Sequence, residues 1–208
     1  VEELAADIRF QRHWLAESDS VVMKILSTEM LARDLHLFSE FLDSPAFVYR
    51  HLPSLNLELT DMSAAERSLS GAIHREFRAM AEIALSTPTS RSIGLDVDLP
   101  RWMIRMLYKP NATLNRVWID FSHFHSLSEQ PLDQLKQHWE DELPGKSSLV
   151  KYVLNPVGSV LSEVSTPDFR PYIARLSDSA GLLRLIRLKR DIHAGNVDSA
   201  DVEAFITR

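Results

Sequence analysis

Helical periodicity runs through most of the long segments of this chain, and glycine, a residue that weakens helices, is scarce. Apolar residues recur at intervals of three and four, which places them on one face of a helix with 3.6 residues per turn. The 208 residues include only six glycines, and 45% of them are hydrophobic, enough for a sizeable core. The sequence therefore predicts an all-α fold, an irregular multi-helix bundle.

The N-terminal part of the chain predicts two helices, at residues 2–17 and about 19–42. The first carries Leu4, Ile8 and Leu15 along one side. The second is apolar on two sides, so we expect it to be central and packed on both. One of its faces contains Val21, Ile25, Leu31, Leu35, Phe38 and Leu42, and the other contains Leu26, Met30, Leu37 and Phe41.

The next segment, residues 44–85, contains helix-capping residues and a run of alternating leucines. Ser44 followed by Pro45 is typical of a helix start, so a short helix is expected there. Leucines alternate at positions 55, 57 and 59, which indicates one short β segment near residues 54–60. Ser63 and Glu66 then form a capping box, and we expect one continuous helix from there to about residue 85. Its buried face would carry Leu69, Ile73, Phe77 and Met80.

Prolines divide the second half of the chain. After a loop at residues 86–100, Pro100 is expected to start a short helix and Pro110 to end it. Asn111 or Thr113 is then expected to cap a helix that continues to about residue 127. Further helices are expected at residues 131–143, after Asn155, at 177–195 and at 198–206. The stretch "LPGKSS" is the best boundary. We therefore expect a main helical bundle at 1–145 and a C-terminal helical layer at 146–208 packed on it, together one structural domain.

Charge and composition argue against several classes of function. The net charge is -6, whereas nucleic-acid binders usually show a basic excess. The absence of cysteine excludes disulfides, thiolate metal sites and a cysteine nucleophile. The sequence also has no glycine-rich phosphate loop and no Gly-x-Ser-x-Gly nucleophile motif. We expect no cofactor and no nucleic-acid partner.

A possible metal site is suggested by Asp120, His123 and His125, which lie close together in the sequence. On a helix, however, residues two apart point about 160° away from each other, so the two histidines cannot bind one ion. We expect His123 to face solvent, His125 to lie in the apolar face with a hydrogen-bond partner, and no metal to be bound.

Glu66, Glu76 and His125 are the catalytic candidates. Both glutamates fall near the apolar face of one predicted helix, and partly buried carboxylates can perform acid–base chemistry or hold metals in a bundle. The capping box offers a structural explanation for Glu66, and nearby arginines offer ion pairs to both carboxylates. Whether the chain is an enzyme is left open, with ion pairing favoured over catalysis.

Two basic stripes are candidate surfaces for a partner. The first combines Arg101, Arg105 and Lys109 with Trp102 and Met106 on a short helix between loops. The second is the series Arg184, Arg187 and Arg190, on the side of a helix opposite its leucines. Such surfaces bind a protein or lie near anionic headgroups at a membrane surface, although ordinary packing or solvation is the alternative.

Several stretches carry a family resemblance: "VVMKILSTEMLARDLHLFSEFL", "ERSLSGAIHREFR", "YKPNATLN", and "NPVGSVL" followed by "PYIARLSDSAGLLRLIRLKRDI". They resemble segments of uncharacterised bacterial envelope proteins with an N-terminal membrane anchor and a helical periplasmic domain. The resemblance covers most of the chain. It implies an anchor before Val1 and a periplasmic location, with the cytoplasm as the alternative, and it implies no activity.

Three functional hypotheses follow from these patterns. The first is a non-enzymatic envelope domain that binds a protein partner or acts as a scaffold. The second is a hydrolase in which Glu66 or Glu76 converges with a histidine, His125 or His74, in an open cleft. The third is a lipid or small-ligand carrier, which requires an apolar cavity of several hundred Å³.

Overall fold

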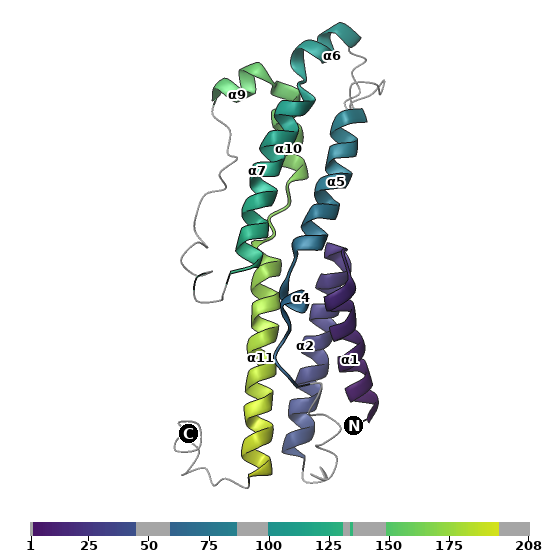
Figure 1. Cartoon of the computed structure of the whole chain (residues 1–208), viewed down its shortest axis with the longest axis vertical. Helices are drawn as coiled ribbons and strands as arrows, with labels where there is room; N and C mark the ends of the chain where they lie inside the picture. The colour runs from purple at the N-terminus through teal and green to yellow at the C-terminus, as the bar shows by residue number, and fades with distance from the viewer. Residues whose placement is uncertain (1, 45–58, 87–99, 131–133, 135–148, 196–208) are drawn as a thin grey trace. The chain divides into compact units, whose positions relative to one another are not determined.

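The structure, a computed structural model, describes residues 2–44, 59–86, 100–130, 134 and 149–195. All regular secondary structure in these residues is helical, which confirms the predicted all-α, multi-helix fold (Figure 1). The helices are α1 (Glu2–Glu17), α2 (Val21–Asp43), α4 (Ala64–Arg67), α5 (Ser70–Ser86), α6 (Arg101–Leu107), α7 (Pro110–Ser128), α9 (Leu149–Leu154), α10 (Pro156–Ser165) and α11 (Arg170–Ala194).

The chain divides into two compact units that interleave in sequence. Unit 1 contains Val1–Ser18, Val22–Ser68 and Ala174–Arg208, and unit 2 contains Asp19–Val21 and Leu69–Ile173. The expected division at residue 146, with residues 146–208 packed as a layer on the rest, stays a prediction.

In unit 1, α1, α2 and α11 each bury one face. The buried face of α2 is the one that the periodicity predicts, because Leu31, Leu35 and Phe38 are fully enclosed. The second apolar face of α2 is not packed: Leu26 is 50% exposed and Phe41 is 46% exposed. The expectation that α2 is packed on both sides was therefore wrong, since the neighbours within unit 1 cover only one of its faces.

In unit 2, α7 packs against both α5 and α10. Its core is aromatic, with ring centroids 5.6 Å apart between Phe121 and Phe169 and 5.2 Å apart between Phe124 and Phe169, both edge to face. The Tyr108 hydroxyl, which is buried, donates a hydrogen bond to the Ala84 carbonyl oxygen at 2.7 Å. This bond ties the residue after α6 to the end of α5.

The helix expected from the capping box to residue 85 is broken in two. The capping box itself is present, but α4 ends at Arg67 and α5 begins at Ser70, with Ser68 in an extended conformation. A buried ammonium group, Lys24 Nζ, accounts for the break. It donates hydrogen bonds to the carbonyl oxygens of Ala65, at 3.3 Å, and of Ser68, at 2.7 Å. In a continuous helix these oxygens would accept backbone N–H groups of the next turn.

Pro110 begins a helix rather than ending one. It occupies the first turn of α7, where its missing N–H costs nothing, and Lys109 is the N-cap residue. Asn111 and Thr113 are therefore inside the helix, and the expectation that either caps it was wrong. The helix α11 starts at Arg170, seven residues before the expected start at residue 177. At this start the Asp168 carboxylate accepts the Arg170 backbone N–H at 3.0 Å.

Several sequence predictions concern residues that the structure does not describe. Most of the expected β segment, residues 54–58, lies outside the described residues, and Leu59 and Thr60 belong to no strand. The expected helices at residues 45–53 and 198–206, nearly all of the one at 131–143, and most of the loop at 86–100 also lie outside them.

Candidate functional site

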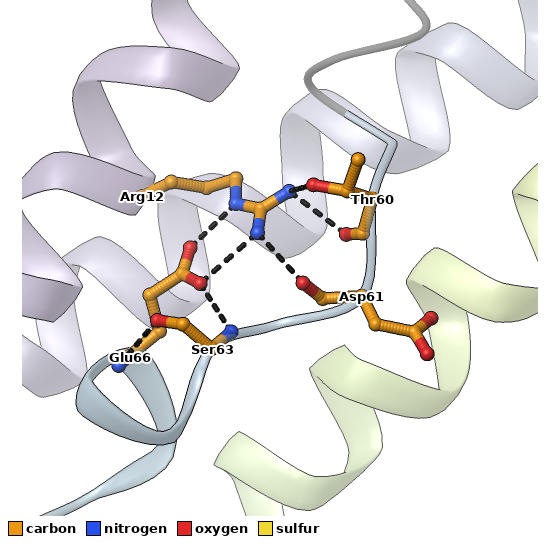
Figure 2. A network of polar contacts seen from close by, with 5 residues as sticks. All are labelled: Arg12, Thr60, Asp61, Ser63 and Glu66. Atoms are coloured by element: carbon orange, nitrogen blue, oxygen red, sulfur yellow. Dashed lines mark hydrogen bonds and ion pairs between the residues drawn. The ribbon is translucent and has the colours of Figure 1, made fainter.

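Glu66, the first catalytic candidate, is held in a network of hydrogen bonds within unit 1 (Figure 2). Its two carboxylate oxygens accept from Arg12, Nε at 2.5 Å and Nη2 at 3.0 Å, and one of them also accepts the Ser63 backbone N–H. The same guanidinium donates to the carbonyl oxygens of Thr60, at 2.9 Å, and Asp61, at 3.1 Å. This buried carboxylate is therefore fully engaged in closing the loop before α4.

The electrostatics of this network fit a structural role. Burial by itself raises the pKa of Glu66, but the hydrogen bonds from Arg12 and Ser63 outweigh it and hold the pKa below its usual value. Lys24, which is 3% exposed, donates to the Leu15 carbonyl oxygen at 2.6 Å as well as to Ala65 and Ser68. Burial lowers the pKa of Lys24, and the nearby Glu66 carboxylate offsets part of this shift. Neither group is free to transfer a proton to a substrate.

His125 lies beside a serine, a pairing that the sequence did not indicate. Its Nε2 is 2.8 Å from the Ser70 hydroxyl oxygen and 3.8 Å from a Glu129 carboxylate oxygen, and its ring centroid is 5.3 Å from that of His74. In a serine hydrolase the serine and the acid bind opposite nitrogens of the imidazole. Here both approach the same nitrogen, so the arrangement does not form a catalytic triad.

Glu76, a catalytic candidate, and His123, from the possible metal site, do not bind other polar groups among the described residues. Glu76 is half-buried on α5, and it makes no hydrogen bond or ion pair with the described residues. His123 is also half-buried, and its Nε2 is enclosed without a hydrogen-bond partner among those residues. The expectation that His123 faces solvent was wrong. Within the described ranges, no three histidine or acidic side chains gather closely enough to hold a metal ion.

The first basic stripe, on and just after α6, includes two exposed apolar side chains. Trp102 and Met106 are each 63% exposed, which agrees with a surface location for this helix. The side chains of Arg101 and Arg105 lie outside the described part of the structure. Lys109 is exposed and caps α7, and its backbone N–H donates to Asn155 Oδ1 at 2.8 Å.

The arginines of α11 are paired within unit 1 rather than presented as a free cationic ridge. Arg184 Nε and Arg187 Nη1 lie 3.6 Å and 3.9 Å from the same Asp61 carboxylate oxygen. Arg190 binds its neighbour Asp191 at 2.6 Å, and its side chain is only 11% exposed. These contacts favour the alternative reading, in which basic residues of α11 complement an acidic neighbour.

The outer face of α2 exposes an apolar stripe, in which Arg33 is the one charged residue. Five side chains, spaced at helical intervals, are 40% to 69% exposed, and we call them the outer stripe. They are Val22, Leu26, Met30, Leu37 and Phe41. Exposed apolar surfaces of this extent in soluble proteins usually mark sites of association.

A pocket of about 400 Å³ opens between α7 and α10 within unit 2. Its wall is rigid because Asn155 binds α7 through both side-chain atoms, accepting the Lys109 N–H at 2.8 Å and donating to Thr113 Oγ1 at 3.0 Å. Gly158 is required here: a Cβ would lie 2.0 Å from Thr113 Oγ1 and 2.2 Å from Asn155 Nδ2. In the sequence, the "NPVG" stretch contains both Asn155 and Gly158, but its pattern predicts only the start of a helix and not a pocket.

Comparisons with protein-family models, with curated proteins and with solved structures found no match to this chain. The resemblance to bacterial envelope proteins therefore stays an expectation. None of the described helices combines the length and the apolar character that a bilayer crossing requires.

Proposed function

We propose that this chain is a non-enzymatic helical scaffold that associates with a second copy of itself through the outer stripe of α2. The observation that carries the proposal is the exposure of that stripe on a helix whose opposite face is enclosed. From Val22 to Phe41 the stripe extends about 29 Å at 1.5 Å per residue, long enough for helix-to-helix packing along its whole length.

The spacing of the stripe favours a second copy as the occupant. Val22 and Phe41 lie at equal distances from the midpoint between Leu31 and Ala32, and so do Leu26 and Leu37. An antiparallel pair of α2 helices related by a two-fold axis would therefore match Val22 with Phe41 and Leu26 with Leu37.

The charges near the axis fit the same register. Arg33, which is exposed within the stripe, would lie opposite Met30 of the second copy. Glu29 of that copy would be one residue away, so the guanidinium would pack its methylenes on Met30 and place its charge near a carboxylate.

The polar groups give less support to catalysis. Both Glu66 oxygens bind Arg12, and the serine and the acid near His125 share one nitrogen. A location on the periplasmic side of a bacterial envelope, tethered by an anchor, is part of the proposal and rests on the resemblance alone.

The test is the mass of the protein in solution, measured by light scattering after size-exclusion chromatography over a range of micromolar concentrations. The wild type is expected to be a dimer, and Leu26→Glu with Leu37→Glu is expected to be a folded monomer with an unchanged helical circular dichroism spectrum, because both side chains are exposed in the single chain. Val164→Glu, at a position that is 83% exposed in unit 2, is the matched control and should stay dimeric. A monomeric wild type, or a double variant that still dimerises, would contradict the proposal.

A further inference from the structure

The α7–α10 pocket has the size of a small-ligand site and an amphipathic lining. Its volume of about 400 Å³ lies in the range of natural ligand pockets. Ile119 and Leu154 line it and are 46% and 57% exposed, so the pocket is open to solvent and apolar on one side. Lys109, Asn115, Arg116 and Ser159 add polar groups to the lining.

Arg116, one of the lining residues, also has hydrogen-bond donors without an acceptor in the described part of the chain. Its side chain is 11% exposed, and Nη2 binds one oxygen of Glu163 at 3.2 Å. Its Nε and Nη1 atoms are buried and have no hydrogen-bond acceptor among the described residues. A buried donor without an acceptor is unfavourable, and more so when it is charged, so this guanidinium would be stabilised by an anion bound nearby.

Glu163 holds the guanidinium without filling its free positions. One carboxylate oxygen accepts from Arg116, and the other accepts from the Tyr152 hydroxyl. The hydrogen bond from Tyr152 lowers the pKa of Glu163, so this carboxylate stays ionised and keeps orienting Arg116. Hydrogen bonds between an arginine and a carboxylate or phosphate are strengthened by the opposite charges of the two groups.

Two helices also begin at the pocket. The lining includes the N-cap and first-turn residues of α7, Lys109 and Ala112, and those of α10, Asn155 and Gly158. Neither N-cap side chain makes a capping hydrogen bond to its own helix. The positive ends of two helix dipoles and the charges of Lys109 and Arg116 therefore all favour an anion, and the lining residues include no acidic side chain.

We propose that the α7–α10 pocket binds an anionic amphiphile, a small molecule with one carboxylate or phosphate group and an apolar body. The anionic group lies near the guanidinium of Arg116 and the starts of α7 and α10, and the apolar body lies against Ile119 and Leu154. This site is independent of the outer stripe of α2, so it holds or fails separately from the proposed scaffold function.

The first test is isothermal titration calorimetry of the whole chain with four probes: octanoate, octyl phosphate, 1-octanol and inorganic phosphate. At least one of the two anionic amphiphiles is expected to bind, and which one does so identifies the head group. 1-Octanol and inorganic phosphate should each bind at least tenfold more weakly, because one lacks the charge and the other lacks the apolar body. No binding of either amphiphile at about 1 mM, or equal binding of 1-octanol or of inorganic phosphate, overturns the proposal.

Variants then locate the binding. Arg116→Met should weaken the anionic probe about tenfold to a hundredfold, the worth of charged hydrogen bonds. Ala112→Phe, at an exposed lining position, should block the pocket while Arg116 is kept, and it keeps the test valid if the first variant fails to fold. Arg175→Met, which removes an exposed ion pair with Glu29 in unit 1, is the matched control and should bind as the wild type does. Unchanged binding by Ala112→Phe would place the probe elsewhere and refute the site.

Discussion

Each of the two units buries an arginine side chain to nearly the same degree, and the two side chains are treated differently. Arg12 in unit 1 is 12% exposed and donates to Glu66, Thr60 and Asp61. Arg116 in unit 2 is 11% exposed, yet two of its nitrogens have no acceptor among the described residues. Burial and charge therefore do not distinguish a structural arginine from a binding arginine, whereas the supply of acceptors does.

The largest effect is expected from Arg12→Met. The substitution leaves Glu66, whose side chain is 6% exposed, as a buried carboxylate without its cation, and breaking such a pair costs about 3 to 5 kcal/mol. The free energy of unfolding, measured by urea denaturation, checks this value. The control is Arg75→Met, because the Arg75–Asp19 pair is more than 60% exposed on both sides and its loss should cost less than about 1 kcal/mol. Equal costs for the two variants would contradict the structural role of Arg12.

The second-largest loss of stability is expected from a substitution in the wall of the pocket. Gly158→Ala forces a Cβ against Thr113 and Asn155, so it should destabilise unit 2 by about 1 to 3 kcal/mol and weaken the anionic probe. Gly181→Ala is the control, since a Cβ there meets nothing within 4 Å, and it should stabilise α11 by up to about 1 kcal/mol. Thermal unfolding distinguishes the two outcomes, and a harmless Gly158→Ala would mean that the wall is not rigid.

Acid should expose the contribution of Glu66. Its pKa in the folded protein lies below the ordinary value of 4.5, so its stabilising effect is complete above pH 4.5 and is lost as the pH falls through the folded pKa. Glu66→Gln should therefore have a lower free energy of unfolding than the wild type at pH 7. The difference between the two free energies should become smaller below pH 4.5. Unfolding free energies of both proteins across this range are the measurement. A difference in unfolding free energy that does not change with pH would show that the charge of Glu66 does not stabilise the fold.

The smallest effect on stability is expected from Arg116→Met, and it sharpens the contrast with Arg12. Because Arg116 is buried with unmet donors, an apolar side chain of similar length should change the free energy of unfolding by less than about 1 kcal/mol. Its partner Glu163 is exposed and can bind water instead. If this variant loses as much stability as Arg12→Met, then Arg116 is a structural arginine as well.

The two regions also differ in how much of them the sequence predicts. The Ser63–Glu66 capping box and the enclosed face of α2 follow from local spacing, and both are confirmed. The break between α4 and α5 depends on Lys24, which is 44 residues from Ser68, so no local pattern reveals it. The same holds for the pocket, because its wall depends on a hydrogen bond between residues 46 positions apart, Lys109 and Asn155.

Periodicity also shows which faces are apolar without showing which are covered. The outer stripe of α2 has the same residue types as the enclosed face, and only the packing of unit 1 distinguishes them. Likewise, the spacing separates His123 from His125 correctly, but the burial of His123 and the Ser70–His125 contact depend on neighbouring segments.

The most direct test of the contrast between the two arginines is the melting temperature of the wild type and of Arg116→Met, each with and without saturating octanoate or octyl phosphate, whichever binds. A ligand that binds only the folded protein raises its melting temperature. We predict a rise for the wild type and a clearly smaller rise for Arg116→Met at the same ligand concentration. An equal rise in both proteins, or no rise in the wild type, would contradict the claim that Arg116 serves a ligand.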